Sequence, residues 1–273
     1  MLKQVNIAVI GAGVMGEAMI AGLLRQELVT AGQIVATEPR GERRAELEAR
    51  YPGMHVTANN SEAARWANVA IFAVKPQSLP KVLPELRGAL GDGELAISIC
   101  AGAPLRQLSE GLEHAAVVRS MPNTPAQIGA GMTVWTASPA VTAEQREWAR
   151  AILASIGREQ YVDDENYLDI ATALNGTGPA YIFMMIEAMI DAGVHMGLPR
   201  YMAQDLVHQT MLGSVQYAMQ SDKHVAELRN GVTSPGGTTA AAMYELEKGG
   251  LRTVLSDAIW AAYRRSAELG KGK

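Results

Sequence analysis

A glycine-rich turn near the N-terminus has the spacing of a pyrophosphate-binding turn. It comprises Gly11, Ala12, Gly13, Val14, Met15 and Gly16, directly after an apolar run at residues 5–10 and at the start of a helical pattern. The first glycine permits a tight turn, the second lets the backbone approach a pyrophosphate, and the third lets the helix lie close to the strand. The helix N-terminus adds N–H groups and positive potential. Such turns also arise for geometric reasons alone, but the strand and helix patterns that follow favour dinucleotide binding.

Charged residues at the end of the second expected strand bear on which dinucleotide binds. A carboxylate there accepts a hydrogen bond from the ribose 2′-hydroxyl of NAD, whereas an arginine accommodates the 2′-phosphate of NADP. Glu38 favours NAD, while Arg40, Arg43 and Arg44 favour NADP. The arginines could equally form an exposed helix face paired with Glu42, Glu46 and Glu48. The sequence therefore leaves the choice between NADPH and NADH open.

A turn in the second half of the chain could hold a small anion. Residues 233–239 read Thr-Ser-Pro-Gly-Gly-Thr-Thr and precede a helical pattern. Successive backbone N–H groups ahead of a helix N-terminus form an anion cradle, and the segment carries four hydroxyl groups. Ordinary helix capping by serine or threonine is the competing interpretation, and from this segment alone it is slightly favoured. A similar turn at residues 175–179 could face the same small carboxylate.

The residue types and their spacing give little support for a metal site or a nucleophilic cysteine. The five histidines are dispersed and form no zinc-binding motif. Glu187, Asp191 and His195 recur at four-residue spacing, but a polar seam on a packed helix is far commoner than a metal site. Cys100 lies at the end of the expected strand at residues 95–99 with no base beside it in sequence, which favours a small buried residue over a nucleophile. We therefore expect no metal.

The elements that must position these residues fall into two regions. The first half alternates short β-branched runs with helical patterns, which is typical of βαβ units in a parallel sheet. Strands are expected at residues 5–10, 34–37, 69–74, 95–99 and 116–119, with added strands at 132–135 and 159–162. Helices are expected at residues 15–25, 42–50, 61–66, 79–90, 105–112 and 142–156. The predicted fold is an α/β, Rossmann-like, doubly wound parallel sheet.

After about residue 164 the strand patterns stop and the chain becomes helical. Helices are expected at residues 180–196, 200–220, 239–248 and 251–269. The first of these is apolar on almost every side, which predicts burial in a larger assembly. We expect a dinucleotide-binding domain at residues 1–164 and an all-α substrate-binding and dimerisation domain at residues 165–273.

Composition and charge exclude several classes of protein. The chain has 273 residues, a formal net charge of −4 and a single cysteine. A net negative charge makes nucleic acid an unlikely partner. One cysteine excludes an intramolecular disulfide framework and fits a reducing compartment. The chain starts without a secretory pattern and has no apolar run of membrane-spanning length, so we expect a cytoplasmic protein with no membrane partner.

Six segments carry a resemblance to a known family. They are residues 11–16, Ala-Val-Lys-Pro at 73–76, Ser-Ile-Cys-Ala-Gly at 98–102, Arg-Ser-Met-Pro-Asn-Thr-Pro at 119–125, Asn-Gly-Thr-Gly-Pro-Ala-Tyr at 175–181, and Val-Thr-Ser-Pro-Gly-Gly-Thr-Thr at 232–239. Their order and spacing over essentially the whole chain resemble the pyrroline-5-carboxylate reductases of proline biosynthesis. The last two segments are the specific ones, because related Rossmann dehydrogenases share only the front half.

The resemblance implies roles for named residues. The cofactor is expected along Gly11 to Gly16 and beside Asn60, Ala73, Val74, Lys75, Pro76, Cys100, Ala101 and Gly102. The substrate carboxylate is expected on the loop formed by Ser234, Pro235, Gly236, Gly237, Thr238 and Thr239. Glu165 and Asp222 match acidic positions that line or close that pocket. Asn175 and Thr177 stand where serines are more usual, which weakens the case for a direct role of their side chains.

The resemblance also implies the reaction and the assembly. Hydride passes from NADPH or NADH to the imine carbon of 1-pyrroline-5-carboxylate, giving L-proline, and the nicotinamide is expected at a cleft between the domains. Thr239 takes the position of the hydroxyl that reaches the ring nitrogen, so it is the expected catalytic residue, either directly or through water. A homodimer with interlocked C-terminal helices is implied, and a ring of such dimers is the larger assembly that the family allows.

Two other functions compete with this interpretation. A 3-hydroxyacid dehydrogenase of similar two-domain plan needs a general acid–base, which that family supplies from a lysine on the first helix of the second domain. This chain has no lysine between Lys81 and Lys223. A non-catalytic dinucleotide-sensing protein would explain the front half, because Rossmann folds host many functions. It would leave the 233–239 turn unused.

Overall fold

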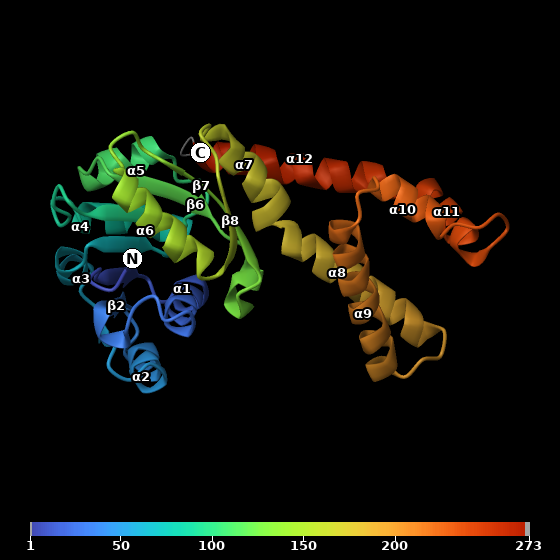
Figure 1. Cartoon of the computed structure of the whole chain (residues 1–273), viewed down its shortest axis with the longest axis horizontal. Coiled ribbons are helices and arrows are strands. Elements are labelled where there is room, and N and C mark those ends of the chain that lie inside the picture. The colour runs from blue at the N-terminus through green and yellow to red at the C-terminus, as the bar shows by residue number, and fades with distance from the viewer. Residues whose placement is uncertain (1, 271–273) are drawn as a thin grey trace. The chain divides into compact units, whose positions relative to one another are not determined.

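The structure is a computed structural model that describes residues 2–270 (Figure 1). It divides into two compact units. Of the described residues, the first unit comprises 2–177 together with 262–270, and the second comprises Gly178–Ala261. The first unit contains the whole sheet, and the second is helical throughout its described elements.

Eight strands of the first unit form one sheet in the order β3-β2-β1-β4-β5-β6-β7-β8. The strands are β1 (Ile7–Ile10), β2 (Ile34–Thr37), β3 (His55–Thr57), β4 (Val69–Phe72), β5 (Leu95–Ser98), β6 (Val117–Met121), β7 (Gly131–Ala137) and β8 (Gly157–Tyr161). Every neighbouring pair is parallel except β6 and β7. The strand order runs outward from β1 in both directions, which confirms the doubly wound sheet.

Helices cover both faces of this sheet because its inner strands are apolar on both faces. Along β1, Ile7 and Val9 belong to one buried cluster and Ala8 and Ile10 to another, as the two-residue period of a strand requires. The first cluster includes residues of α1 (Val14–Arg25) and α6 (Ala143–Ala154). The second includes residues of α3 (Asn60–Trp66), α4 (Leu79–Glu85) and α5 (Leu105–Leu112). The helix α2 (Gly41–Arg50) contributes Leu47 to the first cluster.

The first unit also contains three short 3₁₀ helices and a π-helical turn. The 3₁₀ helices are η1 (Ala31–Gln33), η2 (Pro76–Ser78) and η3 (Thr124–Ile128), and the π-helical turn η4 (Thr172–Gly176) directly follows α7 (Asn166–Ala171). The end of α12 (Leu251–Gly270) also lies in this unit, where Ser266 Oγ donates a hydrogen bond of 2.9 Å to Asp169 Oδ1. The compact units divide after residue 177, and α7 packs against β6 and β7 of the sheet.

The second unit is built from α8 (Gly178–His195), α9 (Arg200–Gln220), α10 (Val225–Gly231), α11 (Thr238–Lys248) and the start of α12. Its buried apolar cluster is small and consists of Ile190, Ala203 and Val207. Gly193 on α8 allows a close approach, since a Cβ there would lie 3.2 Å from the Ala203 Cβ. Of the 18 residues of α8 only Ile190 and Gly193 are buried within the chain.

The second unit exposes many large apolar side chains within one chain. They include Phe183, Met184, Tyr201, Leu206, Leu212, Val215, Tyr217, Met219, Tyr244 and Val254. An exposed apolar surface of this extent is typical of a protein–protein interface. No helix within residues 2–270 is both long and apolar enough to cross a membrane.

Candidate active site

The glycine turn after β1 is held by the end of β2. The Gly11 N–H donates a hydrogen bond of 3.0 Å to Thr37 Oγ1, and the Ala12 N–H donates one of 2.8 Å to the Thr37 carbonyl oxygen. Gly11 has a φ of +94°, which strongly favours glycine. A Cβ at this position would also lie only 2.8 Å from Val74 Cγ1. The turn is thus fixed by neighbours on both sides of β1.

The other two glycines of the turn differ in how much space a side chain would have. A Cβ on Gly16 would collide with the carbonyl oxygen of Gly11, so the helix α1 can lie against the turn only with glycine there. A Cβ on Gly13, in contrast, would meet no protein atom within 4 Å. Val14, the first residue of α1, is exposed. The fold therefore requires Gly11 and Gly16, whereas Gly13 leaves open space in front of a helix N-terminus.

A cavity of about 520 Å³ opens beside this turn. It lies at the carboxyl ends of β1, β2 and β4, where the strand order reverses and where open α/β sheets bind ligands. The predicted residues that line it are Gly11, Gly13, Glu38, Arg40, Asn60, Ala73, Val74 and Lys75. Thr37, Pro39, Ala58, Ser78 and Val82 also line it and were not predicted. Thr37 could have been found as the residue just before Glu38.

The remaining predicted cofactor residues lie outside the cavity lining. Ala12, Val14, Met15 and Gly16 form the turn and the start of α1, and Pro76 begins η2. Cys100, Ala101 and Gly102 follow β5. A Cβ on Gly102 would lie 2.7 Å from the Leu269 Cβ, so this glycine accommodates the end of α12. Its small size has a packing reason within the chain.

Cys100 is a buried thiol without nucleophilic character. Its Sγ lies 3.2 Å from the Val74 carbonyl oxygen and 3.5 Å from that of Phe72. Burial raises the pKa of the thiol to about 11, so it stays protonated near neutral pH. The expectation of a small buried residue at this position is confirmed.

The side of the cavity at the end of β2 carries an ion pair. Arg40 Nε lies 2.8 Å from Glu38 Oε1, and the Arg40 N–H donates a second hydrogen bond of 3.1 Å to the same oxygen. Hydrogen bonding from Arg40 lowers the pKa of the Glu38 carboxyl below its usual range, so the group is charged at neutral pH. Arg43 and Arg44 lie on α2 and are not among the cavity residues.

The 234–239 loop, defined by Ser234 to Thr239, belongs to the second unit. The Gly237 N–H donates a hydrogen bond of 3.1 Å to the Ser234 carbonyl oxygen, and Gly236 has a φ of +70°. A Cβ on Gly237 would collide with Ser234 Oγ. Thr238 is the first residue of α11, and Thr239 is half-buried. The loop is therefore a tight glycine-dependent turn at the start of an 11-residue helix.

The two predicted acidic residues have different surroundings. Asp222 is exposed between α9 and α10 in the second unit. Glu165 lies in the first unit, where its Oε1 accepts hydrogen bonds from the Leu105 N–H at 2.7 Å and from Arg119 Nη1 at 3.0 Å. Arg119 is buried and also donates a hydrogen bond of 2.8 Å to Asp169. Within the described first unit, Glu165 holds the start of α5.

The side chain of Asn175 is committed to the backbone of the first unit. Its amide nitrogen donates hydrogen bonds to the carbonyl oxygens of Met121, at 3.2 Å, and Met132, at 3.0 Å. Thr177 Oγ1 donates one of 2.9 Å to the Thr172 carbonyl oxygen. These contacts give both side chains a structural role, in agreement with the reservation drawn from the sequence.

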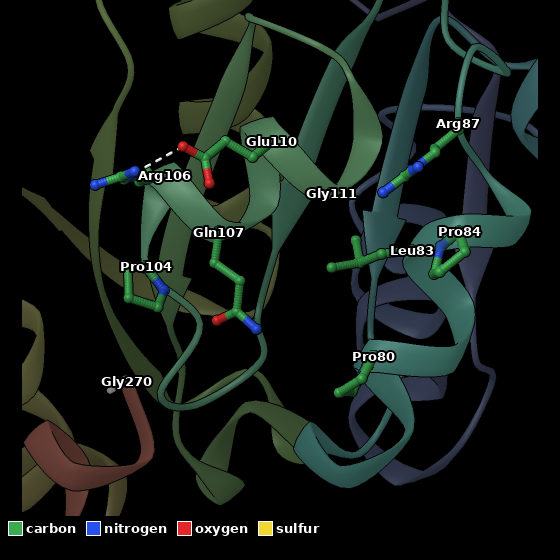
Figure 2. A pocket seen from close by; sticks show the side chains of 10 residues that line it. All are labelled: Pro80, Leu83, Pro84, Arg87, Pro104, Arg106, Gln107, Glu110, Gly111 and Gly270. Carbon is green, nitrogen blue, oxygen red and sulfur yellow. Dashed lines mark hydrogen bonds and ion pairs between the residues drawn. The ribbon is translucent and has the colours of Figure 1, made fainter. Parts of the chain in front are cut away.

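A second cavity, of about 460 Å³, lies between α4 and α5 (Figure 2). No residue singled out by the sequence lines it. Two of its charged side chains, Arg106 and Glu110, form a 2.7 Å ion pair with one another (Figure 2). Among the described residues, no cluster of three or more histidine, cysteine, aspartate or glutamate side chains is placed to hold a metal ion.

Comparisons with known proteins match both regions of the chain. Residues 165–269 match a family model described as pyrroline-5-carboxylate reductase dimerisation, and residues 6–102 match one described as NADP oxidoreductase coenzyme F420-dependent. The pyrroline-5-carboxylate reductase of Synechocystis sp. is 43% identical over 98% of this chain and 99% of its own length. That of Pisum sativum is 41% identical over 97% of this chain and 96% of its own.

A solved structure agrees with these sequence matches. The crystal structure of a Plasmodium falciparum pyrroline carboxylate reductase with NADP bound superposes with a TM-score of 0.90 and 31% identity. The superposition covers 98% of this chain and 99% of that one.

Proposed function

The chain belongs to the pyrroline-5-carboxylate reductase family, and from this premise we propose that it reduces 1-pyrroline-5-carboxylate to L-proline with NADH or NADPH. The observation that carries the proposal is the agreement of the whole-length family match with the cavity at the strand-order reversal beside the glycine turn. A Rossmann match alone would support only dinucleotide binding. The helical half also matches a pyrroline-5-carboxylate reductase family model, at residues 165–269, and this match supports the proposed substrate.

The glycine turn and its cavity fit a nicotinamide dinucleotide. The open space at Gly13, the N-terminus of α1 and the charged Glu38 supply the three features that pyrophosphate and ribose recognition need. Asn60, Ala73, Val74 and Lys75 are assigned to the walls of the same cavity. A bound reduced nicotinamide supplies hydride to the imine carbon of the substrate.

The substrate carboxylate is assigned to the 234–239 loop. Gly236 and Gly237 allow the backbone to turn tightly just before α11, which directs N–H groups and positive potential toward an anion. Asp222 is proposed to close this pocket from the α9–α10 connection. Glu165 is retained only as an acidic lining residue, because its Oε1 already accepts two hydrogen bonds within the first unit.

Thr239 is the proposed catalytic residue. The ring nitrogen of the imine must end with a proton when the carbon receives hydride. The Thr239 hydroxyl is the group that the family resemblance assigns to this nitrogen, as a direct donor or through water. No titratable side chain occurs in residues 233–239, so the loop itself provides hydroxyl and backbone groups alone. The chain thus contributes orientation and proton supply, while fixing the face of attack through the carboxylate.

A homodimer is the proposed assembly. The match of residues 165–269 to a dimerisation family supports it, and so does the exposed apolar surface of α8 and α9. Interlocked C-terminal helices and a ring of dimers are proposed as the finer arrangement. A cytoplasmic location is also proposed, since the single cysteine is a buried free thiol.

The test measures oxidation of NADH and NADPH by the purified protein in the presence of 1-pyrroline-5-carboxylate. Rapid oxidation that depends on this substrate is expected. A 3-hydroxyacid with NAD⁺ serves as the control and should give no turnover. Tight nucleotide binding without substrate-dependent oxidation would overturn the reductase and leave a dinucleotide-sensing protein.

A further inference from the structure

The Glu38 carboxylate is a buried charge in the wall of the cofactor cavity. The residue is 5% exposed and follows β2 directly, and its backbone N–H donates a hydrogen bond of 3.0 Å to the Thr57 carbonyl oxygen. A buried carboxylate must be satisfied by donors. Its position at the end of β2 is the one that meets the adenosine ribose in dinucleotide-binding folds.

Arg40 donates more hydrogen bonds to one oxygen of this carboxylate than to the other. Oε1 accepts two hydrogen bonds, from Arg40 Nε at 2.8 Å and from the Arg40 N–H at 3.1 Å. Oε2 accepts a single, longer one of 3.3 Å from Arg40 Nη2. A carboxylate offers about four acceptor sites, so Oε2 keeps capacity for a further donor. A ribose 2′-hydroxyl is a donor, whereas a 2′-phosphate offers mainly acceptors and negative charge.

The side chains of the other two arginines near this end already have hydrogen-bond or ion-pair partners, and neither arginine lines the cavity. Arg43 pairs with Glu17 on α1 and lies 2.9 Å from Glu46 on its own helix. Arg44 Nη1 donates hydrogen bonds to the carbonyl oxygens of Glu38, at 2.9 Å, and Pro39, at 2.8 Å.

The remaining basic residue in the cavity wall is not at the β2 end. Lys75 follows β4, and β1 lies between β4 and β2 in the sheet. Of the residues that line the cavity, Arg40 is therefore the cation at the β2 end, and its charge is already paired with Glu38.

We propose that Glu38 makes NADH the preferred cofactor of this chain, by accepting the ribose 2′-hydroxyl at Oε2 and repelling a 2′-phosphate. The inference rests on the proposed function for the reaction that uses the cofactor. It concerns only the adenosine end of the cavity. Arg40 acts as a positioning residue that holds the carboxylate charged and in place.

The test is a titration of the full-length protein with NADH and with NADPH, in the absence of substrate, followed by the fluorescence of the nucleotide. NADH is expected to bind at least about tenfold more tightly than NADPH. Glu38→Gln keeps the shape and a carbonyl acceptor but removes the charge, so it should bring the two affinities to within about threefold. Arg40→Gln removes the neutralising cation, so it should widen the preference for NADH.

Glu46→Gln is the matched control. It removes the same charge from an exposed position on α2 outside the cavity, and should leave the affinity ratio unchanged. Equal affinities in the parent protein, tighter binding of NADPH, failure of NADH to bind, or equal effects of Glu38→Gln and Glu46→Gln would each overturn the inference. The titration contains no substrate, so it is independent of the turnover assay. A protein that prefers NADH in the titration but does not reduce 1-pyrroline-5-carboxylate in the turnover assay would count against the proposed function alone.

Discussion

A Cβ atom on Gly16 would collide with the carbonyl oxygen of Gly11, so these two residues lock the first helix against the turn that follows β1. Gly13 lies between them in sequence and has no such constraint. Its φ of −72° is also open to other residues. The three glycines of one motif therefore divide into two that the fold requires and one that a ligand would require.

Replacing these glycines one at a time should show that one is needed for stability and another for cofactor binding. Gly16→Ala should cost about 1–3 kcal/mol of unfolding free energy, because the added methyl group overpacks the turn. Gly13→Ala should change stability by less than about 0.5 kcal/mol. It should nonetheless weaken dinucleotide binding by about tenfold or more, since the methyl group would occupy the approach of the pyrophosphate.

Urea denaturation and nucleotide titration of both variants check this division. A Gly13→Ala protein that binds the dinucleotide as tightly as the parent would contradict the assignment of the turn.

Thr239→Ala should lower kcat without weakening cofactor binding. Loss of a proton-donating group typically costs about a hundredfold or more in rate. Thr239→Ser keeps the hydroxyl and should recover most of the activity. Steady-state kinetics, with dinucleotide affinity measured in parallel, give the comparison. An unchanged kcat in Thr239→Ala would remove this residue from the mechanism.

The buried Arg119 should be important for stability. It pairs with Glu165 at 3.0 Å and with Asp169 at 2.8 Å, and it is 4% exposed. Arg119→Met should destabilise the protein by about 3–5 kcal/mol, because it leaves two partly buried carboxylates without their cation. Arg106→Met breaks an exposed pair one helical turn apart and should cost less than about 1 kcal/mol. Similar urea midpoints for the two variants would show that the buried network contributes little.

Thr133 offers a stabilising substitution. Among the described residues, its Oγ1 is the buried side-chain oxygen or nitrogen atom that lacks a hydrogen-bond partner. Thr133→Val has nearly the same shape and removes the unsatisfied hydroxyl, so it should raise stability by about 1 kcal/mol. Thr172→Val instead removes a hydroxyl that donates to the Leu168 carbonyl oxygen at 2.7 Å, and should not stabilise. Thermal unfolding of the two variants and the parent protein tests this prediction. A melting temperature of Thr133→Val below that of the parent would refute it.

Cys100 should make stability fall at alkaline pH. Burial raises its pKa in the folded protein to about 11, whereas the unfolded thiol ionises near its ordinary value. Its contribution to stability is therefore full below the unfolded pKa and declines as pH rises toward the folded pKa.

The Cys100→Ala variant isolates this effect. The difference in unfolding free energy between the parent and the variant should shrink as pH rises from about 9 to about 11. In the native protein at mildly alkaline pH, a thiol reagent should also react far more slowly than in urea. A flat difference across this range would contradict the buried, protonated thiol.

The parallel sheet was predictable because β1, β2, β4 and β5 are apolar on both faces. The edge strand β3 was not predicted, since it has three residues and only Val56 is buried. The helix expected at residues 79–90 ends at Glu85, just after Pro84, and Gly88 beyond it has a φ of +63°. Short edges and helix ends depend on tertiary contacts that the residue pattern does not carry.

The cavity was also predicted in outline and not in detail. The glycine spacing located the turn, but the pairing of Arg43 with Glu17 depends on how α2 lies against α1. Asp169 accepts hydrogen bonds from Arg119, which is 50 residues away in sequence, and from Ser266, which is 97 residues away. No local sequence motif predicts these contacts. The roles proposed for Asp222, Ser234 and Thr239 remain predictions.

The most direct test of the reductase is a coupled balance of the reaction. Purified protein, reduced nicotinamide dinucleotide and 1-pyrroline-5-carboxylate are combined, and the oxidised nucleotide and the L-proline formed are measured in the same sample. Equal amounts of both are expected, with neither formed when the protein or the imine is left out. Oxidation of the nucleotide without proline, or no oxidation by a protein that binds the nucleotide, would contradict it.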